Sequence, residues 1–589
     1  MTEGENLALN VAQSLKGKRW LWRGVDPRLA QAISQREGVS ELAGRLLAPR
    51  AGSLEGVADY LEPKLRNLLP NPSFFVGMDA AAERTAAAVA AGEKIALFGD
   101  YDVDGATSSA QLLRLLNSVG CEPVVHIPDR LMEGYGPNIP ALEALAENGV
   151  RLVIFLDCGT TAFAPLEAAE KLGLEVIVLD HHTAEPVLPP ALALVNPNRL
   201  DQEPGFGQLA ACGVTFLFCV ALNRALKAVG HPPQIELMSL LDLVALGTVC
   251  DVVPLTGLNR AFVQQGLKVM ANRQNSGLAA LSDISGIKDK LTSYHLGFLL
   301  GPRINAGGRL GDSSLGVRLL SSDDPGYCWP IAEQLNELNA ERKAVEDDVL
   351  ENALAAAEAQ QSPVVLVDGE GWHPGVIGIV ASRLVERTGR PACVIGWEED
   401  GKGKASGRSL AGVNLGQAVI NARQAGLLLA GGGHAMAAGF TIEREKLADL
   451  HAYLNEHLGE TIAAAQKDAA LTLEGALGVD GANAALADMV EQLGPYGPGN
   501  AEPRFVIQNA QIAFADTVGE SHVRARLGGA GQGKLKAIAF RARDTALGEA
   551  LLSAQGRPLH LAGRLKRDRW TGGDAVELHI EDAAWPEGG

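Results

Sequence analysis

Three short apolar runs, each followed by acidic or imidazole side chains, constrain the fold of this chain most strongly. Residues 95–98, 152–156 and 176–179 are typical of buried strands, and the segments between them are long enough for crossover helices. We therefore predict an α/β doubly wound parallel sheet, in which the carboxyl ends of the strands open into one crevice. The runs are followed by Asp100-Tyr101-Asp102-Val103-Asp104, Asp157-Cys158-Gly159 and Asp180-His181-His182. Carboxylates with imidazole suit Mn²⁺ or Mg²⁺ better than a thiolate-preferring metal, so the pattern predicts a two-metal hydrolytic site.

Composition adds broad limits. A chain of 589 residues is expected to form about three or four domains. It has no 18-residue apolar run and neither a basic nor an apolar N-terminus, so we expect a cytoplasmic protein without a membrane segment. Its seven Cys are scattered without a C-x-x-C pair, which indicates reduced thiols. The net charge of −19 argues against nucleic-acid binding over the whole surface, although a local basic groove remains compatible with it.

The order of the patterns predicts five segments. Residues 1–75 are a Pro- and Leu-rich N-terminal extension, and 76–325 alternate strand-like and helix-like runs. A long connecting helix is expected at 326–361, where apolar residues recur at helical spacing among many charges. Residues 362–465 predict a second, smaller α/β domain, and 466–589 predict a linker and a β-rich domain.

The β-rich domain has the strand pattern of an OB-fold. Five strands are expected, with a short helix near 545–552 between the third and the fourth. The strands are predicted near 505–514, 521–527, 534–541, 559–566 and 575–580. Residues 521–570 contain eleven Lys and Arg against three acids, which favours binding of a single nucleic-acid strand. Trp570 is either a stacking platform for bases or an ordinary packing residue.

Four motifs in order now carry a resemblance. They are the D-x-D of Asp102 and Asp104, Asp180-His181-His182, the segment 301–309 (GPRINAGGR) and the segment 432–439 (GGHAMAAG). Together they resemble the DHH phosphoesterase superfamily, and most closely its RecJ family of single-stranded-DNA exonucleases, over nearly the whole chain. The resemblance implies a DHH catalytic domain at 76–325 and a DHHA1 domain at 362–465. It also implies metal-dependent 5′ to 3′ degradation of single-stranded DNA to 5′-mononucleotides, in recombination and repair.

The resemblance assigns the metal ligands. They would be Asp102, Asp104, Asp157, His181 and Asp251, holding two Mn²⁺ or Mg²⁺ ions. Asp157 is a candidate bridge between the ions because one carboxylate offers two oxygens. His182 would contact the phosphate or orient the attacking group. The assignment of Asp251 depends mainly on the resemblance, and a helix-terminal cap is its alternative.

One position departs from the pattern of the small DHH phosphatases and pyrophosphatases. These carry a His four residues before the first Asp of D-x-D, whereas this chain has Phe98, with Asp100 nearby. The RecJ family also has an Asp there, so the departure favours a nuclease over a pyrophosphatase. Asp100 is a catalytic-site candidate with three roles left open: a metal ligand, a group behind the ligands, or a turn cap.

Substrate contacts follow from the same resemblance. Arg130, Ser406 and Arg408 match positions that hold a 5′-terminal phosphate, which a bidentate guanidinium suits. Recognition of that end by the second domain would impose 5′ to 3′ polarity. Further substrate contacts would be Arg303, Asn305, Arg309 and His434, the last in a Gly-rich loop closing onto the nucleotide. The alternatives are solvated surface charges for the arginines, a structural hydrogen-bond network for the 303–309 set and a polar core residue for His434.

Partners and alternative functions complete the expectations. The resemblance implies single-stranded DNA as substrate, a single-strand-binding protein and a helicase as partners, no membrane, and a monomer. One alternative is a DHH phosphodiesterase for short oligonucleotides or cyclic dinucleotides, which would not account for the OB-like domain. Another is a non-catalytic RecJ-like DNA-binding scaffold. Such a scaffold is expected to lose metal ligands, and the ligand set here is intact.

Overall fold

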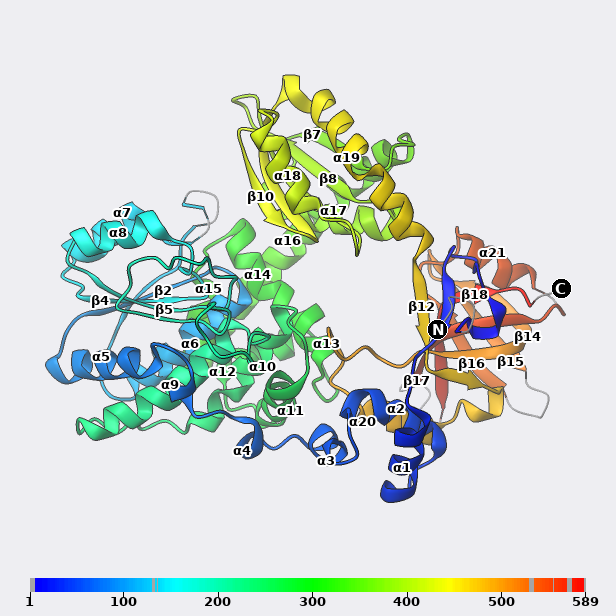
Figure 1. Ribbon diagram of the computed structural model, residues 1–589, viewed down its shortest axis with the longest axis horizontal. Coiled ribbons are helices and arrows are strands. Elements are labelled where there is room, and N and C mark those ends of the chain that lie inside the picture. The colour runs from blue at the N-terminus through cyan, green and yellow to red at the C-terminus, as the bar shows by residue number, and fades with distance from the viewer. Residues whose placement is uncertain are drawn as a thin grey trace. The chain divides into compact units, whose positions relative to one another are not determined.

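The computed structural model describes residues 6–129, 133–134, 136–528, 534–554, 556–568 and 575–586. The chain divides into two compact units, whose elements are labelled in Figure 1. The first unit contains Met1–Leu61, Ala344–Gly494 and Glu502–Gly589. The second unit contains Glu62–Lys343 and the short segment Pro495–Ala501.

A parallel five-stranded sheet organises the second unit. Its strand order is β3-β2-β4-β5-β6, and every neighbouring pair is parallel. The strands are β2 (Ile95–Gly99), β3 (Val124–His126), β4 (Leu152–Leu156), β5 (Glu175–Leu179) and β6 (Ala193–Val195). The three apolar runs are therefore β2, β4 and β5, and their predicted parallel arrangement is confirmed.

Helices cover both faces of this sheet. Along β2, Ile95 and Leu97 pack in a core shared with α5, α6 and α9, whereas Ala96 and Phe98 pack in a second core with α7 and α8. These helices are α5 (Met78–Ala91), α6 (Val103–Asn117), α7 (Ile139–Glu147), α8 (Phe163–Lys171) and α9 (Ala211–Ala228). Alternate side chains of a strand point to opposite faces, so a sheet covered on both sides needs the nearly continuous apolar strands seen here. The doubly wound architecture is confirmed.

More helices complete the second unit and connect it onward. They are α4 (Leu65–Leu68), α10 (Leu241–Cys250), α11 (Gly257–Ala271), α12 (Ser276–Ile284), α13 (Ser293–His295), the π-helical turn η4 (Leu296–Leu300), α14 (Gly301–Leu310) and α15 (Leu315–Ser321). The predicted long helix is α16 (Pro325–Glu358). Within the described part of the chain, α9 alone is long and apolar enough to cross a bilayer, and most of it is buried, as in the core helix of a folded domain.

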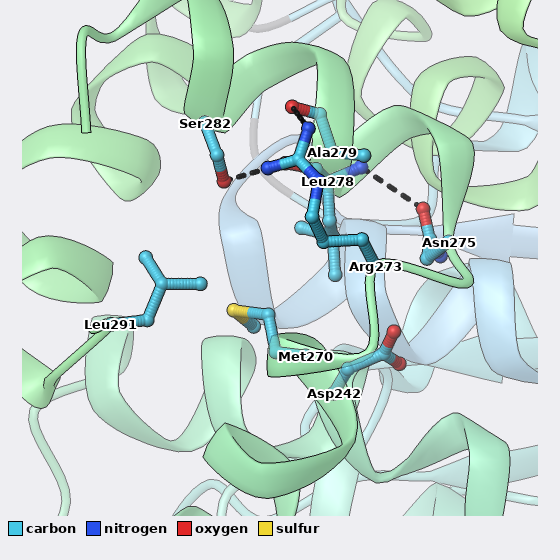
Figure 2. Close-up of a pocket in the computed structure, with 8 residues that line it drawn as sticks. All are labelled: Asp242, Met270, Arg273, Asn275, Leu278, Ala279, Ser282 and Leu291. Atoms are coloured by element: carbon cyan, nitrogen blue, oxygen red, sulfur yellow. Dashed lines mark hydrogen bonds between the residues drawn. The ribbon is translucent and has the colours of Figure 1, made fainter. Parts of the chain in front are cut away.

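A small cavity lies beside α10 and α12 (Figure 2). It is lined by Asp242, Met270, Arg273, Asn275, Leu278, Ala279, Ser282 and Leu291. Its volume is about 10 Å³, which suffices for one water molecule at most. Burial raises the pKa of Asp242, on the first turn of α10, to about 7. The cavity is too small for a substrate, so we do not assign it a catalytic role.

A mixed sheet lies in the first unit. Its order is β10-β11-β9-β8-β7, with β7 and β8 parallel and the other pairs antiparallel. The elements are β7 (Val365–Glu370), α17 (Pro374–Thr388), β8 (Ala392–Trp397), β9 (Lys402–Arg408), α18 (Leu415–Gln424), β10 (Ala430–His434), β11 (Ala437–Glu443) and α19 (Leu447–Lys467). The predicted Gly-rich loop is instead β10 of a β10–β11 hairpin. A Cβ on Gly433 would lie 2.3 Å from the carbonyl oxygen of Ala437, so this tight pairing requires glycine.

The C-terminal sheet closes into a barrel. Its order is β13-β14-β15-β16-β18-β17, and β14 also pairs with β17. The elements of this region of the chain are β12 (Ala470–Leu473), which is outside the barrel sheet, β13 (Gly475–Leu477), α20 (Ala484–Gln492), β14 (Phe505–Val518), β15 (His522–Gly528), β16 (Lys534–Ala539), α21 (Ala546–Ser553), β17 (Leu559–Arg567) and β18 (Val576–Ala584). Register shifts along the 14-residue β14 bend it enough to pair with β17 at one end and β15 at the other. The predicted five strands with a helix between the third and fourth are confirmed as an OB-like barrel.

The N-terminal segment packs against this barrel region. Its elements are β1 (Arg19–Trp22), α1 (Pro27–Glu37), α2 (Glu41–Ala51) and α3 (Gly56–Leu61). Strand β1 pairs in parallel with β12, and the buried Trp20 donates from Nε1 to Oδ2 of Asp582 at 3.0 Å. Ser14 Oγ donates to the same oxygen at 2.6 Å. Residues up to Leu61 thus belong to the first unit, whereas the second unit begins at Glu62.

Candidate metal centre

Strand register places a row of polar residues along one edge of the parallel sheet. The last residues of β2, β4, β5 and β6 are in register with one another. The next residues along the chain are Asp100, Asp157, Asp180 and Asn196. The amides of the three Asp residues continue the ladder, each donating to the carbonyl at the end of the neighbouring strand at 3.0 to 3.2 Å. Parallel pairing therefore brings together residues that are almost 100 positions apart.

The D-x-D motif forms the start of α6. Asp102 is the N-cap, and its Oδ1 accepts from the amides of Asp104 at 2.9 Å and Gly105 at 3.1 Å. A Cβ on Gly105 would lie 2.5 Å from the carbonyl oxygen of Asp100, so the loop closes this tightly only over glycine. The cap and the glycine together fix where the Asp100, Asp102 and Asp104 carboxylates point.

Asp104 is held by a second helix. Its two carboxylate oxygens accept from the backbone amides of Ala211 at 2.7 Å and Cys212 at 2.8 Å, at the N-terminus of α9. A helix N-terminus favours a negative charge. Burial nevertheless raises the pKa of Asp104, a shift that the charge of His181 partly offsets. The side chain is oriented before any ion binds.

His181 lies among carboxylates from three other segments, namely the end of β4, the first turn of α6 and the C-cap of α10. Its Nε2 lies 3.3 Å from Oδ1 of Asp157, 3.6 Å from Oδ2 of Asp251 and 3.9 Å from Oδ2 of Asp104. Asp157 itself adopts a φ of 64°, a left-handed conformation that is strained for a residue other than glycine. Such strain is typical of a side chain whose direction matters at a functional site.

Asp251 lies at the C-cap of α10. In the sequence, a simple helix cap remained an alternative role for Asp251, but in the structure its carboxylate faces His181. Burial, followed by the charges of Asp104 and Asp102, raises the pKa of Asp251 to about 9. Within the described residues, its buried Oδ2 accepts no hydrogen bond. An oxygen of this kind, aimed at an imidazole and other carboxylates, fits a cation ligand.

Asp180 positions His182. Oδ1 of Asp180 accepts from Nδ1 of His182 at 2.7 Å, and Oδ2 accepts from the amide of Thr160 at 3.0 Å. Burial lowers the pKa of His182, but the hydrogen bond and charge of Asp180 outweigh it and raise the pKa to about 9. In turn, His182 and Thr160 hold the pKa of Asp180 below its usual range despite burial.

An open cavity of about 240 Å³ exposes this cluster. It is lined by Asp100, Tyr101, Asp102, Asp157, His182, Asp251, Asn305 and Arg309. Asn305 and Arg309 lie one turn apart on α14, whose Gly308 packs against Tyr101: a Cβ at Gly308 would be 3.0 Å from the Tyr101 carbonyl oxygen. The cavity therefore combines acidic, imidazole, amide and guanidinium groups.

The donor set fits divalent cations. Three overlapping groups have ligand atoms within 4.8 Å of one another: Asp157, His181 and His182; Asp104, His181 and Asp251; and Asp100, Asp102 and Asp157. Burial and then the neighbouring carboxylates hold the pKa of Asp157 well above its usual range. Mutual repulsion of this kind is relieved by bound positive charge, and carboxylates with imidazole suit Mn²⁺ or Mg²⁺.

Other predicted site residues lie elsewhere. Arg303, on α14, donates from Nη1 to the carbonyl of Leu299 at 2.7 Å and from Nε to Asn336 Oδ1 at 3.0 Å. Ser406, Arg408 and His434 lie on the mixed sheet of the first unit, with Arg408 Nη1 donating to Ser406 Oγ at 3.2 Å. Ala437 of β11 pairs with His434 of β10 on one side and with Arg408 of β9 on the other, so the three residues lie in one row across the sheet. Arg130 and Trp570 lie outside the described residues.

The barrel is less basic in structure than in the sequence window. Among the described residues of the window 521–570, ion pairs engage six Lys and Arg side chains: Arg524, Lys536, Arg543, Arg564, Lys566 and Arg567. Several partners, such as Glu502 and Asp488, lie outside the window 521–570. The count of eleven bases against three acids therefore overstates the charge available to a nucleic acid.

Sequence reasoning missed three contributors to the centre. In the sequence, Asp180 had a place in a motif but no role of its own, and Tyr101 only preceded the D-x-D motif. Asn196 was not identified. Asn196 Nδ2 donates to Thr160 Oγ1 and to the carbonyl of His182, both at 2.8 Å. A polar residue directly after a fourth short apolar run, Ala193–Val195, was the available signal.

Three family models match the chain. They are described as the DHH family N-terminal domain at residues 94–248, the DHHA1 domain at 360–460 and the RecJ OB domain at 473–582. The single-stranded-DNA-specific exonuclease RecJ of Escherichia coli is 34% identical over 547 residues, covering 90% of this chain and 93% of that protein. The chain belongs to the RecJ family. The RecJ of Bacillus subtilis is 32% identical over 97% of this chain and 71% of its own length.

Solved RecJ structures agree with this assignment. The crystal structure of RecJ in complex with Mn²⁺ from Thermus thermophilus has a TM-score of 0.79 and 29% identity, covering 96% of this chain and 80% of that one. A structure of the exonuclease RecJ bound to manganese has a TM-score of 0.58 and 35% identity over 68% of this chain and 99% of that one. A further Thermus thermophilus RecJ structure contains Mg²⁺. The predicted family is confirmed, and the solved RecJ structures contain Mn²⁺ and Mg²⁺, the two ions that the donor set of this chain suits.

Proposed function

We propose that this RecJ-family chain degrades single-stranded DNA from its 5′ end and releases 5′-mononucleotides in recombination and repair. One observation carries the proposal: the acidic and imidazole cluster shares an open cavity with Asn305 and Arg309. Metal ligands beside an amide and a guanidinium suit a phosphodiester, which needs both a hydrolytic centre and neutralisation of its charge.

The metal ligands in this proposal are Asp102, Asp104, Asp157, His181 and Asp251, with Asp100 as a further ligand. Asp157 belongs both to the group with His181 and to the group with Asp102, which supports its role as a bridge between two ions. Two bound ions would supply a Lewis acid and an activated water. The carboxylates would be ionised when the ions bind, because a ligand must give up its proton.

The remaining cavity residues would act on the phosphodiester. His182, held as a cation by Asp180, would donate from Nε2 to a phosphate oxygen, because its Nδ1 is already committed. The Arg309 guanidinium and the Asn305 amide would orient the same group. Asp180 would be a positioning residue. Its carboxylate acts through His182 and the backbone, not on the substrate.

Polarity would come from recognition of the 5′-terminal phosphate. Ser406 and Arg408 lie two residues apart on β9, so their side chains are on the same face of the strand. A hydroxyl next to a guanidinium supports binding of a phosphate dianion. Arg130 and His434 would add contacts to the terminal nucleotide, and Arg303 would stabilise α14 and contact the strand beyond it.

The five-segment division of the chain remains part of the proposal. The matched ranges 94–248 and 473–582 lie inside the proposed DHH (76–325) and OB (466–589) regions, and the matched range 360–460 overlaps the proposed DHHA1 region (362–465). The N-terminal extension (1–75) and the connecting helix (326–361) would complete the chain. The barrel would bind the single strand through the Lys and Arg side chains that are not in the ion pairs given above, and through aromatic stacking.

We further propose a cytoplasmic monomer that works with a single-strand-binding protein and a helicase. An exonuclease that accepts only one strand needs exposed single strands, and these partners would supply them. The seven cysteines are free thiols, which supports a reducing compartment.

Matched single-stranded and blunt duplex DNA, each with a 5′ phosphate and a 3′ label, test the function. With Mn²⁺ or Mg²⁺ we expect stepwise shortening of the single strand alone, abolished by chelator. Cleavage restricted to very short oligonucleotides would indicate the small-substrate phosphodiesterase instead. Tight binding without shortening would indicate the non-catalytic scaffold.

A further inference from the structure

Two aromatic rings of the second unit are left in solvent. Tyr294 is 58% exposed and Phe298 is 70% exposed. Their rings are stacked, with centroids 5.1 Å apart and planes 25° apart. Burial of such side chains stabilises a fold, and this fold forgoes that gain for both rings. A flat, paired and exposed aromatic surface is typical of a binding site.

The pair lies on the same helical segment as the cavity. Tyr294 belongs to α13 and Phe298 to the π-helical turn η4, which continues directly into α14. Asn305 of α14, which lines the cavity, follows Phe298 by seven residues. Seven helical residues span about 10 Å, so the rings lie a short distance along the helix from the candidate metal centre.

A second contact ties η4 to the metal cluster. Cys250 Sγ donates to the carbonyl oxygen of Leu296 at 3.5 Å. A Cβ on Gly301 would lie 2.5 Å from the same sulfur, so the glycine permits this close packing. Cys250 directly precedes Asp251, and Val252 beyond it is 65% exposed. The helical segment that carries the rings is therefore packed against the residue that precedes a proposed metal ligand.

The segment is held in place from several directions. Leu296 and Leu300 are fully buried, and Phe298, halfway between them, points the opposite way. Thr292 and His295 form a capping box at the start of α13, and Ser293 Oγ donates to the carbonyl of Tyr496 at 3.0 Å. Arg303 binds the carbonyl of Leu299, at the C-terminal side of the π turn. The rings are thus presented on a rigid support, and π turns occur often at functional sites.

We propose that Tyr294 and Phe298 form a base-stacking platform for the substrate strand, for nucleotides that lie 3′ to the one being released. The inference depends on the proposed function for the identity of the substrate. Every nucleobase has a π face, so stacking retains a strand without selecting its sequence. An exonuclease that moves along any sequence requires that property.

Nucleobases fit the platform better than a protein partner does. The surface is two stacked rings on one helical face, and the same helical segment carries Asn305 and Arg309, which would contact the phosphodiester. A groove that receives an apolar peptide needs walls, whereas these rings project from a helix. Docking of a protein is therefore the outcome that the experiment must separate from stacking.

Fluorescence of 2-aminopurine tests the platform directly. Oligonucleotides with a 5′ phosphate carry the probe at one position at a time, and the full-length protein is used with chelator so that no hydrolysis occurs. We expect quenching at positions a few nucleotides from the 5′ end. Phe298→Ala and Tyr294→Ala should remove that quenching and weaken binding about tenfold each, the scale of one stacked base. Phe298→Trp should retain both.

Steady-state kinetics give a second readout. Phe298→Ala should raise KM for long single strands about tenfold and leave kcat unchanged. A 5′-phosphorylated dinucleotide, too short to reach the rings, should be cleaved as by the unchanged protein. Trp329→Ala is a matched control because Trp329 is also an exposed aromatic of the second unit, at 43%, and lies on α16. Surface truncations of this kind should leave the thermal unfolding midpoint within about 2 °C.

The outcomes are distinguishable. A Tyr294→Ala, Phe298→Ala double variant that binds and quenches as the unchanged protein does would overturn the platform, even if shortening of DNA proceeds, and would leave the rings as a protein-docking surface. If the unchanged protein shortens no DNA, the proposed function fails. The quenching series then still decides whether single strands stack on these rings.

Discussion

The imidazole of His182 donates from Nδ1 to Oδ1 of Asp180, at 2.7 Å, and the backbone amide of His182 donates to the same oxygen at 3.2 Å. One buried carboxylate therefore fixes both the ring and the peptide that carries it. Because Asp180 follows β5 in register with Asp157 after β4, the same strand pairing places the imidazole of His182 beside the metal cluster, with Nδ1 3.9 Å from Oδ1 of Asp157.

Asp180→Asn should lower the pKa of His182 from about 9 toward the ordinary value near 6.5, because the charge and acceptor that raise it are lost. At about pH 8 the ring would then be neutral in the variant and cationic in the unchanged protein. Histidine-selective NMR titration of the metal-free protein measures this. An unchanged titration midpoint would mean that the charges of Asp251 and Asp104, and not Asp180, raise the pKa of His182.

Asp104→Asn should abolish hydrolysis while the fold is kept. Asn retains one oxygen for the α9 amides that Asp104 now satisfies, so the fold should be kept. Because Asp104 is itself a proposed metal ligand, the loss of activity should exceed the roughly 100-fold typical of groups behind metal ligands. Asp104→Ala should lose activity too, and it should also unfold at lower temperature because two buried amides lose their acceptor. Activity under Mn²⁺ and thermal unfolding, measured together, separate these effects. A fully active Asn variant would contradict the ligand assignment.

Metal binding should release protons at neutral pH. Without an ion, the pKa of Asp251 is raised to about 9, so its carboxyl holds a proton at pH 7, and burial raises the pKa of Asp157 in the same direction. Because the ions need ionised carboxylates, their affinity should rise with pH up to about 9. Calorimetry in buffers of different ionisation enthalpy counts the released protons. Equal heats in all buffers would show that the cluster is already ionised.

Gly105→Ala should disrupt the D-x-D loop. The new Cβ would lie 2.5 Å from the carbonyl oxygen of Asp100 and must displace backbone. We expect a loss of stability of a few kcal/mol and of most activity. Gly213→Ala is the matched control, because its Cβ would meet side chains at 3.4 Å or more and alanine favours a helix by about 1 kcal/mol. Similar melting curves for the two variants would contradict the close packing.

Asp242→Asn should remove a pH-dependent loss of stability. The buried native carboxyl titrates near pH 7, whereas an unfolded Asp titrates near 3.8. Between these values the native state holds an extra proton, so its stability falls as pH rises and levels off above about pH 7. The Asn variant should gain a few kcal/mol relative to the unchanged protein between about pH 4 and pH 8. Thermal unfolding over that range provides the measurement, and parallel curves would count against the assignment.

Much of the site could be predicted because its signals are local. Asp102 and Asp104 follow an apolar run at a spacing that caps a helix, and Asp157 and Asp180 end two further runs. Parallel pairing was enough to expect convergence of these residues. Asp251 could be placed only by resemblance, since its helix-terminal position looks like an ordinary cap until its carboxylate is seen to face His181.

Some expectations failed because their causes are not local. The segment around Gly432 reads as a loop by composition, but it pairs with β11 as a strand because glycines allow a close hairpin. The basic excess of the barrel shrinks because acids such as Glu502, which lie outside the window 521–570, pair with its basic side chains. The pairing of β1 with β12 joins positions 451 residues apart, and local propensity has no information about such a partner.

By itself, the sequence determined which side chains of this protein bear chemistry, through strand-end acids, a histidine pair and motif order. Only the tertiary structure decided how they act together: the amides of α9 that orient Asp104, the burial that raises the pKa of Asp251, and the helical continuity between Phe298 and Asn305. The physical reason is that residue identity is encoded locally, whereas distance, burial and electrostatic coupling arise when distant segments pack together.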